Sequence, residues 1–199
     1  MRLVLASASP RRADLLRAAG FDFDTVVVEL DESVRRGEAA SEYVRRLAME
    51  KSALAMERLG PAARGSVVLG ADTSVVIDGR ILGKPRSGEE AAEMLRQLSG
   101  RWHEVMTGIS LRHDAVEAGR VVATAVEFSP LAEGDIEWYL RSGEGMDKAG
   151  AYAVQGLASR FIPRIHGSYA NVVGLPVAAV RELIAEIASN PLTGYSRQD

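Results

Sequence analysis

The sequence predicts an α/β protein with a mixed β-sheet flanked by helices, and three observations support this. Residues 3–6 form a continuous apolar run typical of a buried strand, and a helical pattern over residues 10–19 follows and ends at Gly20. Asp78-Gly79 joins two apolar runs, which is the signal of a tight β-hairpin. Strand pairs mix with helices along the chain without a regular βαβ repeat, so the sheet should be mixed rather than all-parallel.

The other elements are expected from their periodicity and flanking residues. Residues 67–77 form a strand run that is interrupted by Gly70-Ala71-Asp72-Thr73, and Ser87 with Glu90 forms a capping box for a helix. A polar loop covers residues 29–38. Further strands are expected at 25–28, 105–111, 121–128, 152–155 and 161–165, and helices at 41–59, 88–98, 135–141 and 177–187. We expect one domain over residues 1–199, with a frayed polar tail from about residue 190.

Composition narrows the class of function. The 199 residues are 47% hydrophobic and 26% charged, which is the balance of an ordinary globular protein. With 24 basic and 27 acidic residues the net charge is −3, which argues against a general nucleic-acid binder. The absence of cysteine excludes disulfides and thiolate chemistry. No apolar stretch has the length of a membrane span or a signal peptide, so a cytoplasmic enzyme or binding protein is expected, with no membrane partner.

The start of the first helix carries an unusual charge. Ser9 is a candidate N-cap and Pro10 a favourable first helical residue, but Arg11 and Arg12 follow at once. Cations in a first turn oppose the helix macrodipole, whereas a bound phosphate would be favoured by the free N–H groups and both guanidinium groups. Ser7 could add a hydroxyl donor. The alternative is a solvated helix start, and from this segment alone the two interpretations are about equal.

Two further charged residues stand where an apolar side chain is expected. Lys51 lies on the apolar stripe of the 41–59 helix, and Asp72 lies inside an apolar strand run beside Gly70. A buried carboxylate needs a cation, a metal or a proton. An acidic residue of the loop after the second strand, such as Glu32, could join Asp72 as an oxygen ligand for Mg²⁺ or Mn²⁺. The alternatives are a lysine whose head reaches water and a structural ion pair.

The remaining candidates are weaker. Lys84, in Gly83-Lys84-Pro85, could be a surface lysine, and His103, His113 and His166 lack the spacing of metal ligands. The chain has no nucleophile elbow, no Walker A loop and no dinucleotide-binding fingerprint. Two classes of function remain: a hydrolase that uses carboxylates and a metal, and a phosphate-binding module.

Together these segments resemble the successive motifs of the Maf family. The resemblance covers nearly the whole chain in order and ends at about residue 187. It rests on Ser7-Ala8-Ser9-Pro10-Arg11-Arg12, Gly70-Ala71-Asp72-Thr73, Gly83-Lys84-Pro85, Thr107-Gly108, Asp147-Lys148-Ala149-Gly150-Ala151-Tyr152, Gln155-Gly156 and Gly167-Ser168-Tyr169. It implies the fold of the Maf and inosine triphosphatase group, an elongated mixed sheet with two lobes and a central cleft. It also implies a pyrophosphatase that cleaves a nucleoside triphosphate between its α- and β-phosphates, and a homodimer.

The resemblance also assigns roles to residues of this sequence. It makes Asp72 the catalytic proton acceptor and Glu32 with Asp72 the ligands of a divalent metal, Mg²⁺ or Mn²⁺ with Co²⁺ as a further candidate. It assigns phosphate contacts to Ser7, Arg11, Lys51 and Lys84, and substrate specificity to Arg12, Thr73 and Gln155. The last three are of the type found in the dTTP/UTP branch. A 7-methyl-GTP pyrophosphatase and a non-catalytic regulator of septum formation are the alternatives.

Overall fold

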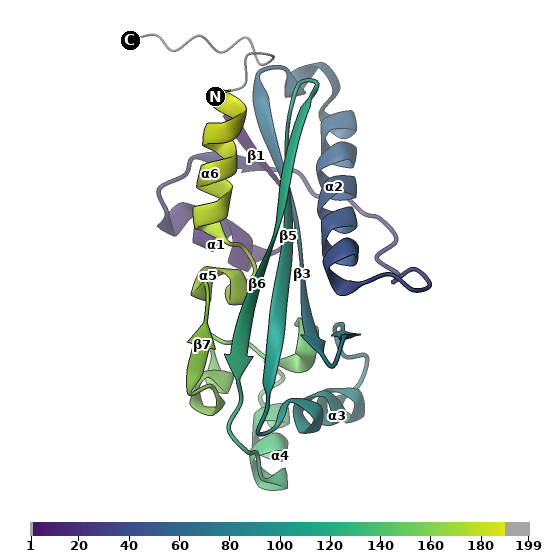
Figure 1. Ribbon diagram of the computed structural model, residues 1–199, viewed down its shortest axis with the longest axis vertical. Coiled ribbons are helices and arrows are strands. Elements are labelled where there is room, and N and C mark those ends of the chain that lie inside the picture. Colours follow the sequence, from purple (N-terminus) through teal and green to yellow (C-terminus); the bar gives the residue numbers. More distant parts are fainter. Residues whose placement is uncertain (1, 190–199) are drawn as a thin grey trace. The chain divides into compact units, whose positions relative to one another are not determined.

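The computed structural model describes residues 2–189, which divide into two compact units. The first unit comprises residues up to Asp72, Thr107–Val122 and the residues from Gly174 on, and the second comprises Thr73–Met106 and Ala123–Val173. The strands β3 (Ser66–Ile77), β5 (Trp102–His113) and β6 (Val116–Glu127) contribute residues to both units. Each unit is therefore built on part of the same long strands (Figure 1).

The strands form one mixed sheet of seven in the order β2-β1-β3-β5-β6-β7, with β4 paired to β3. The strands β1 (Arg2–Ala6), β2 (Phe23–Thr25) and β3 pair in parallel, whereas β4 (Arg80–Leu82) with β3 and β7 (Arg164–His166) with β6 pair antiparallel. The predicted α/β class with a mixed sheet flanked by helices is confirmed. The 67–77 run is one unbroken strand rather than an interrupted one.

In the first unit, helices cover both faces of the sheet. Alternate residues of a strand point to opposite faces, and here the odd-numbered residues of β1 and β3 pack against α1 (Pro10–Ala18) and α6 (Val177–Ala188). The even-numbered ones, such as Val4 and Val68, pack against α2 (Ala40–Leu59). Asp72 continues the even-numbered series, so the alternation directs it to the face that α2 covers.

Two glycines allow α2 to lie directly against the strands. A Cβ atom on Gly70 would come within 2.1 Å of the Ala48 carbonyl oxygen, and one on Gly108 within 2.2 Å of the Val44 carbonyl oxygen. Contacts this short do not occur, so only glycine permits this approach. Gly70, expected to allow a close approach of backbone or ligand, therefore accommodates the backbone of α2.

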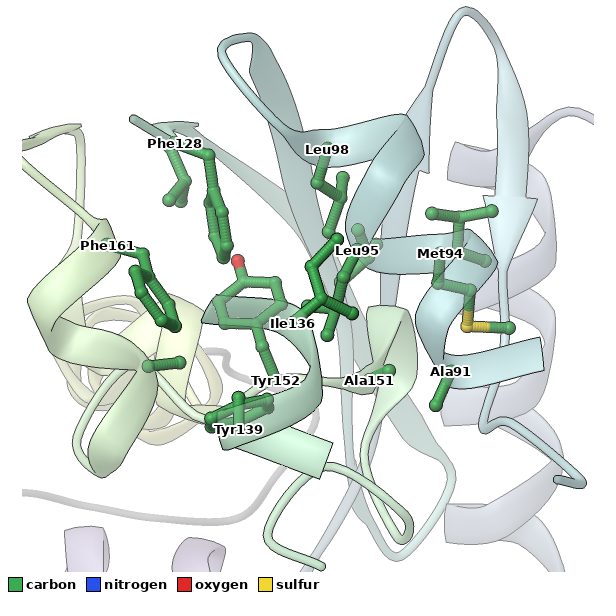
Figure 2. Close-up of a cluster of buried hydrophobic side chains, with 14 of the residues drawn as sticks. Ala91, Met94, Leu95, Leu98, Phe128, Ile136, Tyr139, Ala151, Tyr152 and Phe161 are labelled. Carbon is green, nitrogen blue, oxygen red and sulfur yellow. The ribbon is translucent and has the colours of Figure 1, made fainter. Parts of the chain in front are cut away.

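The second unit has its own hydrophobic core (Figure 2). The apolar stripe of α3 (Gly88–Leu98) packs there with Ile136 and Tyr139 of α4 (Glu133–Arg141). Phe128, Tyr152 and Phe161 belong to the same cluster, and Phe128 meets Tyr152 edge to face with ring centroids 5.0 Å apart. The predicted hairpin is also confirmed, since Asp78 and Gly79 both have positive φ, as a type I′ turn requires.

The N-terminal cap of α3 differs in part from the capping box that the sequence predicts. The Ser87 side chain accepts a hydrogen bond from the Glu90 N–H at 3.1 Å, as expected. The Glu90 carboxylate, however, accepts from the N–H of Arg86, one residue before the cap, at 2.8 Å. The reciprocal half of the box is thus shifted by one residue.

Three predicted strands are wrong in whole or in part. Residues 152–155 are coil and turn, and Leu157–Phe161 is a short 3-10 helix, so the strand expected at 161–165 is reduced to β7. The apolar residues of this segment are buried by the core of the second unit and not by pairing with another strand. The strand expected at 25–28 corresponds to β2, which ends at Thr25, so residues 26–28 lie outside the strand.

The other short helical segments of the described residues are 3-10 turns at Gly60–Ala63 and Ala149–Ala151 and the helix α5 (Tyr169–Val173). The expected tail from about residue 190 lies outside the described residues. Within residues 2–189, no helix combines the length and the apolar character that crossing a membrane requires.

Candidate active site

The central feature of the first unit is an ammonium group held between two carboxylates. The Lys51 Nζ atom lies 2.6 Å from Glu32 Oε1 and 2.7 Å from Asp72 Oδ1. The side chains of Lys51 and Asp72 are only 10% and 11% exposed, whereas that of Glu32 is 47% exposed. Two carboxylate oxygens therefore converge on one point at the edge of the protein interior.

The sequence explains why Lys51 and Asp72 meet. Lys51 lies on the buried stripe of α2 with Leu47, Ala48 and Ala55, as its spacing predicts. Asp72 lies on the strand face that α2 covers, and Gly70 lets the helix approach that face closely. The interpretation of Lys51 as a lysine whose head reaches water is wrong, because the ammonium donates to the buried Asp72 carboxylate.

Helix α2 also positions Glu32. The Tyr43 hydroxyl donates to the Glu32 carbonyl oxygen at 2.8 Å, and the Arg46 guanidinium donates to the Ser33 carbonyl oxygen at 3.0 Å. Arg46 is itself fixed by Glu38, with its Nε 2.6 Å from Oε1. Burial, reinforced by the nearby carboxylates, raises the pKa of Tyr43 to about 12, so its hydroxyl remains a donor at neutral pH. No sequence motif points to Tyr43 or Arg46, although both lie on the helix that carries Lys51.

At the start of α1, Arg12 binds the protein backbone. Its Nε donates to the Gly174 carbonyl oxygen and its Nη1 to the Ala71 carbonyl oxygen, both at 2.9 Å, and Nη1 lies 3.2 Å from Ser7 Oγ. Arg12 thus connects α1 to the residue before Asp72. Burial lowers the pKa of Arg12 from its usual value, and the charge of Asp72 acts in the opposite direction.

The remaining groups of this segment are more accessible. Ser7 and Arg11 are half-buried, and Ser7 Oγ accepts from the Ser9 N–H at 3.1 Å. The helix begins at Pro10 as predicted, but the Ser9 side chain makes no capping hydrogen bond. The first turn of α1 is therefore without a side-chain cap from Ser9.

Three predicted site residues, Thr73, Lys84 and Gln155, belong to the second unit. Thr73 is half-buried, and the exposed Lys84 lies in the loop after β4. The Gly83 carbonyl oxygen of that loop accepts from the Gly150 N–H at 3.1 Å, which joins the Gly83-Lys84-Pro85 motif to the Ala149-Gly150-Ala151 turn. Gln155 is exposed in the turn that follows Tyr152 and Ala153. The structure thus connects two motifs that are about 65 residues apart in the chain.

Two of the histidines have structural partners, as preferred for them from the sequence. His103 is buried and its Nε2 lies 2.8 Å from the Tyr152 hydroxyl, while the Nδ1 of buried His113 lies 2.9 Å from the Ser66 carbonyl oxygen. Within residues 2–189 no three side chains of histidine, aspartate or glutamate form a group able to hold a metal ion.

The pair Glu32 and Asp72 nevertheless has the donor chemistry of a divalent cation site. Both carboxylates already contact one cationic group, the Lys51 ammonium, so they can share a positive charge. Mg²⁺ is commonly held by one or two carboxylates together with water and substrate phosphates. A metal ion with these two protein ligands therefore fits the residues present.

The fold and these groups define an α/β protein with a largely buried charged site formed by Glu32, Lys51 and Asp72. A family model described as "Maf-like protein" matches residues 2–187. The chain belongs to the Maf family.

Relatives at nearly half identity carry one common name. A dTTP/UTP pyrophosphatase of Anaeromyxobacter is 48% identical over 96% of this chain and 91% of its own length. Another of that name, from Vibrio parahaemolyticus, is 49% identical over 94% of this chain and 97% of its own length. A solved structure, the nucleoside-triphosphatase or dITP/XTP pyrophosphatase of Mycobacterium abscessus, aligns with 96% of each chain at 15% identity and a TM-score of 0.44.

Proposed function

We propose that this protein is a nucleoside triphosphate pyrophosphatase that hydrolyses dTTP and UTP to the monophosphate and pyrophosphate. The observation that carries the proposal is the convergence of Glu32, Lys51 and Asp72 at a largely buried point of a Maf-family chain. The names of the relatives at 48% and 49% identity support dTTP and UTP as substrates.

Asp72 is the proposed proton acceptor. In the reaction, the oxygen of a water molecule forms a bond to the α-phosphorus, and the bond from that phosphorus to the oxygen bridging to the β-phosphate breaks. Pyrophosphate leaves with the electron pair, and the water proton passes to the Asp72 carboxylate. The hydrogen bond from Lys51 fixes the orientation of this carboxylate, which favours a reproducible position for the water.

The cationic side chains would neutralise the triphosphate. Ser7, Arg11, Lys51 and Lys84 are the proposed phosphate contacts, because a polyanion needs several donors to replace its hydration. Lys51 would exchange part of its contact with the carboxylates for a phosphate oxygen. Arg12 and Thr73 are the proposed specificity residues together with Gln155, whose amide can both donate to and accept from a pyrimidine edge.

A divalent cation would complete the site. Glu32 and Asp72 are its proposed ligands, and Mg²⁺, Mn²⁺ and Co²⁺ are the candidates. When bound, such an ion supplies positive charge that stabilises the developing charge on the phosphates. A homodimer and a cytoplasmic location remain predictions from the sequence.

The substitution Asp72→Asn tests the proposal. The purified protein is incubated with dTTP, UTP and 7-methyl-GTP, with and without Mg²⁺, Mn²⁺ or Co²⁺, and pyrophosphate release is measured. We expect metal-dependent release from dTTP and UTP, with kcat reduced by at least about 100-fold in the variant because the proton acceptor is lost.

Three results would contradict it. Turnover of dTTP by Asp72→Asn near the wild-type rate would remove Asp72 from its role. Preference for 7-methyl-GTP would favour the alternative branch, and absence of pyrophosphate release from every nucleotide would favour a non-catalytic regulator.

A further inference from the structure

The loop that contains Gln155 is held by the carboxylate of Glu144, a residue with no role in the proposed reaction. Gln155 lies in a turn between Tyr152 and the 3-10 helix Leu157–Phe161, outside any strand. The Gln155 side chain is exposed, and among the described residues it has no hydrogen-bond partner in the protein. Its amide is therefore available, and its position depends on what fixes the backbone on either side.

Glu144 fixes the backbone after Gln155. One carboxylate oxygen, Oε2, accepts from the Leu157 N–H at 2.9 Å, and the other, Oε1, accepts from the Ala158 N–H at 3.4 Å. These are the first two N–H groups of the 3-10 helix, which have no partner within the helix itself. A negative charge is also favourable at this end of a helix. Glu144 thus acts as a cap from a distant part of the chain.

Tyr139 fixes the backbone before Gln155. Its hydroxyl accepts from the Ala153 N–H at 3.2 Å and donates to Glu144 Oε1 at 2.9 Å. Tyr139 is fully buried, and burial raises the pKa of its phenol, as does the hydrogen bond to Glu144. The hydroxyl therefore stays protonated and connects the two contacts into one chain of hydrogen bonds.

The backbone around Glu144 is closely packed. A Cβ atom on Gly156 would lie 2.2 Å from Glu144 Oε2, so the residue after Gln155 has to be glycine while Glu144 is in place. The backbone of Glu144 is tied down as well, since the Lys148 ammonium donates to its carbonyl oxygen at 2.6 Å. The next residue, Gly145, packs so closely that a Cβ atom would lie 2.1 Å from the Ala151 carbonyl oxygen.

We propose that Glu144 and Tyr139 are positioning residues that set nucleobase selectivity by fixing the backbone on both sides of Gln155. Neither residue would touch the base. Selectivity by hydrogen bonding depends on a donor and an acceptor held at the right place, so a loosened loop would admit the wrong base more easily. This inference rests on the proposed function, in which Gln155 reads the base.

The test uses variants in wild-type and Gln155→Ala backgrounds. Glu144→Ala removes all three contacts of the carboxylate, Glu144→Gln keeps one acceptor oxygen, and Tyr139→Phe removes only the hydroxyl. The control is Glu133→Gln, on the same helix as Tyr139, because the Glu133 carboxylate bonds Arg96 and does not contact the loop.

Two quantities are measured for each variant. The first is amide hydrogen exchange in the peptide that covers residues 153–158, which reports the loop without any substrate. The second is the ratio of kcat/KM for dTTP to that for dCTP, because these nucleotides differ in the base edge that an amide would read. Pyrophosphate release is the activity readout.

We expect faster exchange in Glu144→Ala and Tyr139→Phe, and a selectivity ratio lowered by about tenfold, since small misplacements of a recognition group cost factors of ten to a hundred. Glu144→Gln should lie between Glu144→Ala and wild type. In the Gln155→Ala background, neither Glu144→Ala nor Tyr139→Phe should lower the ratio further, because the group that they position is gone.

Other outcomes would overturn the proposal. An unchanged ratio in a variant with faster exchange would mean that loop order does not set selectivity. An equal additional loss in the Gln155→Ala background would mean that Glu144 acts independently of Gln155. If Glu144→Ala does not fold, Tyr139→Phe and Glu144→Gln decide the matter. Failure of the proposed function is distinguishable, because the wild-type protein would then release no pyrophosphate from dTTP or UTP.

Discussion

Replacing Lys51 by methionine would test how much the Lys51 ammonium stabilises the Glu32 and Asp72 carboxylates in the folded protein. Methionine keeps most of the length and apolar surface of the lysine stem, so the change removes mainly the charge. The Lys51 ammonium lies 2.7 Å from Asp72 Oδ1 and 2.6 Å from Glu32 Oε1. Without it, both carboxylates lose the ammonium group that they share.

The size of the effect follows from the burial of each carboxylate. The Glu32 side chain is 47% exposed and can be solvated by water, whereas that of Asp72 is 11% exposed and cannot. Removing one partner of a buried ion pair costs roughly 3–5 kcal/mol. Because only the Asp72 carboxylate is largely buried, we expect a loss of stability at the lower end, about 3 kcal/mol. For a chain of this size that corresponds to a fall in Tm on the order of 10 °C.

The assay is thermal and urea unfolding in a metal chelator and then in Mn²⁺. Lys84→Met is the matched control, because Lys84 is exposed and has no ion-pair partner among the described residues. Mn²⁺ at about 100 times its Kd stabilises a folded protein by about 2.7 kcal/mol. Its stabilising effect should be larger in Lys51→Met than in wild type, because the ion no longer competes with the ammonium.

A second substitution isolates the cause. In Lys51→Met/Asp72→Asn the buried side chain is neutral, so most of the lost stability should return relative to Lys51→Met alone. The reasoning is refuted if Lys51→Met unfolds like wild type in chelator, or if the double variant is less stable than the single one.

The structure makes two further predictions about stability. His103 is 3% exposed, and burial lowers its pKa to about 4 from an ordinary value of 6.5, so its contribution to stability is complete above pH 6.5 and is lost as the pH falls towards 4. At pH 5 the free energy of unfolding measured in urea should be about 2 kcal/mol lower than at neutral pH. In His103→Phe this pH-dependent loss should disappear. The same loss of stability in the variant would exclude His103 as its origin. For Gly70→Ala we expect a loss of several kcal/mol, because the new Cβ atom would lie 2.1 Å from the Ala48 carbonyl oxygen, whereas Gly83→Ala, with open space around it, should change stability little in the same urea experiment.

The sequence by itself determined the elements whose signals are local. Pro10 marks the first residue of α1, Asp78-Gly79 marks the hairpin, and the stripe of α2 includes Lys51. These predictions succeed because a helix start at proline, a type I′ turn and a helical stripe depend on residues only a few positions apart. The order of the motifs was sufficient to indicate the family.

Only the tertiary structure decided what the charged residues contact. Asp72 and Lys51 are 21 positions apart, and their ion pair exists because Gly70 lets α2 approach β3. Arg12, which the family resemblance assigns to substrate specificity, donates to the Gly174 carbonyl oxygen 162 positions away.

The same limit explains the segment around Gln155. Residues 152–155 have the apolar pattern of a strand, yet Glu144 and Tyr139 take the backbone N–H groups on either side of Gln155, and the core of the second unit buries the apolar side chains. Periodicity reports that a side chain is buried, but the partner of each backbone group is set by contacts that are distant in the sequence. The local sequence therefore determines the helix starts, turns and buried faces, whereas long-range packing determines which side chains and backbone groups contact each other.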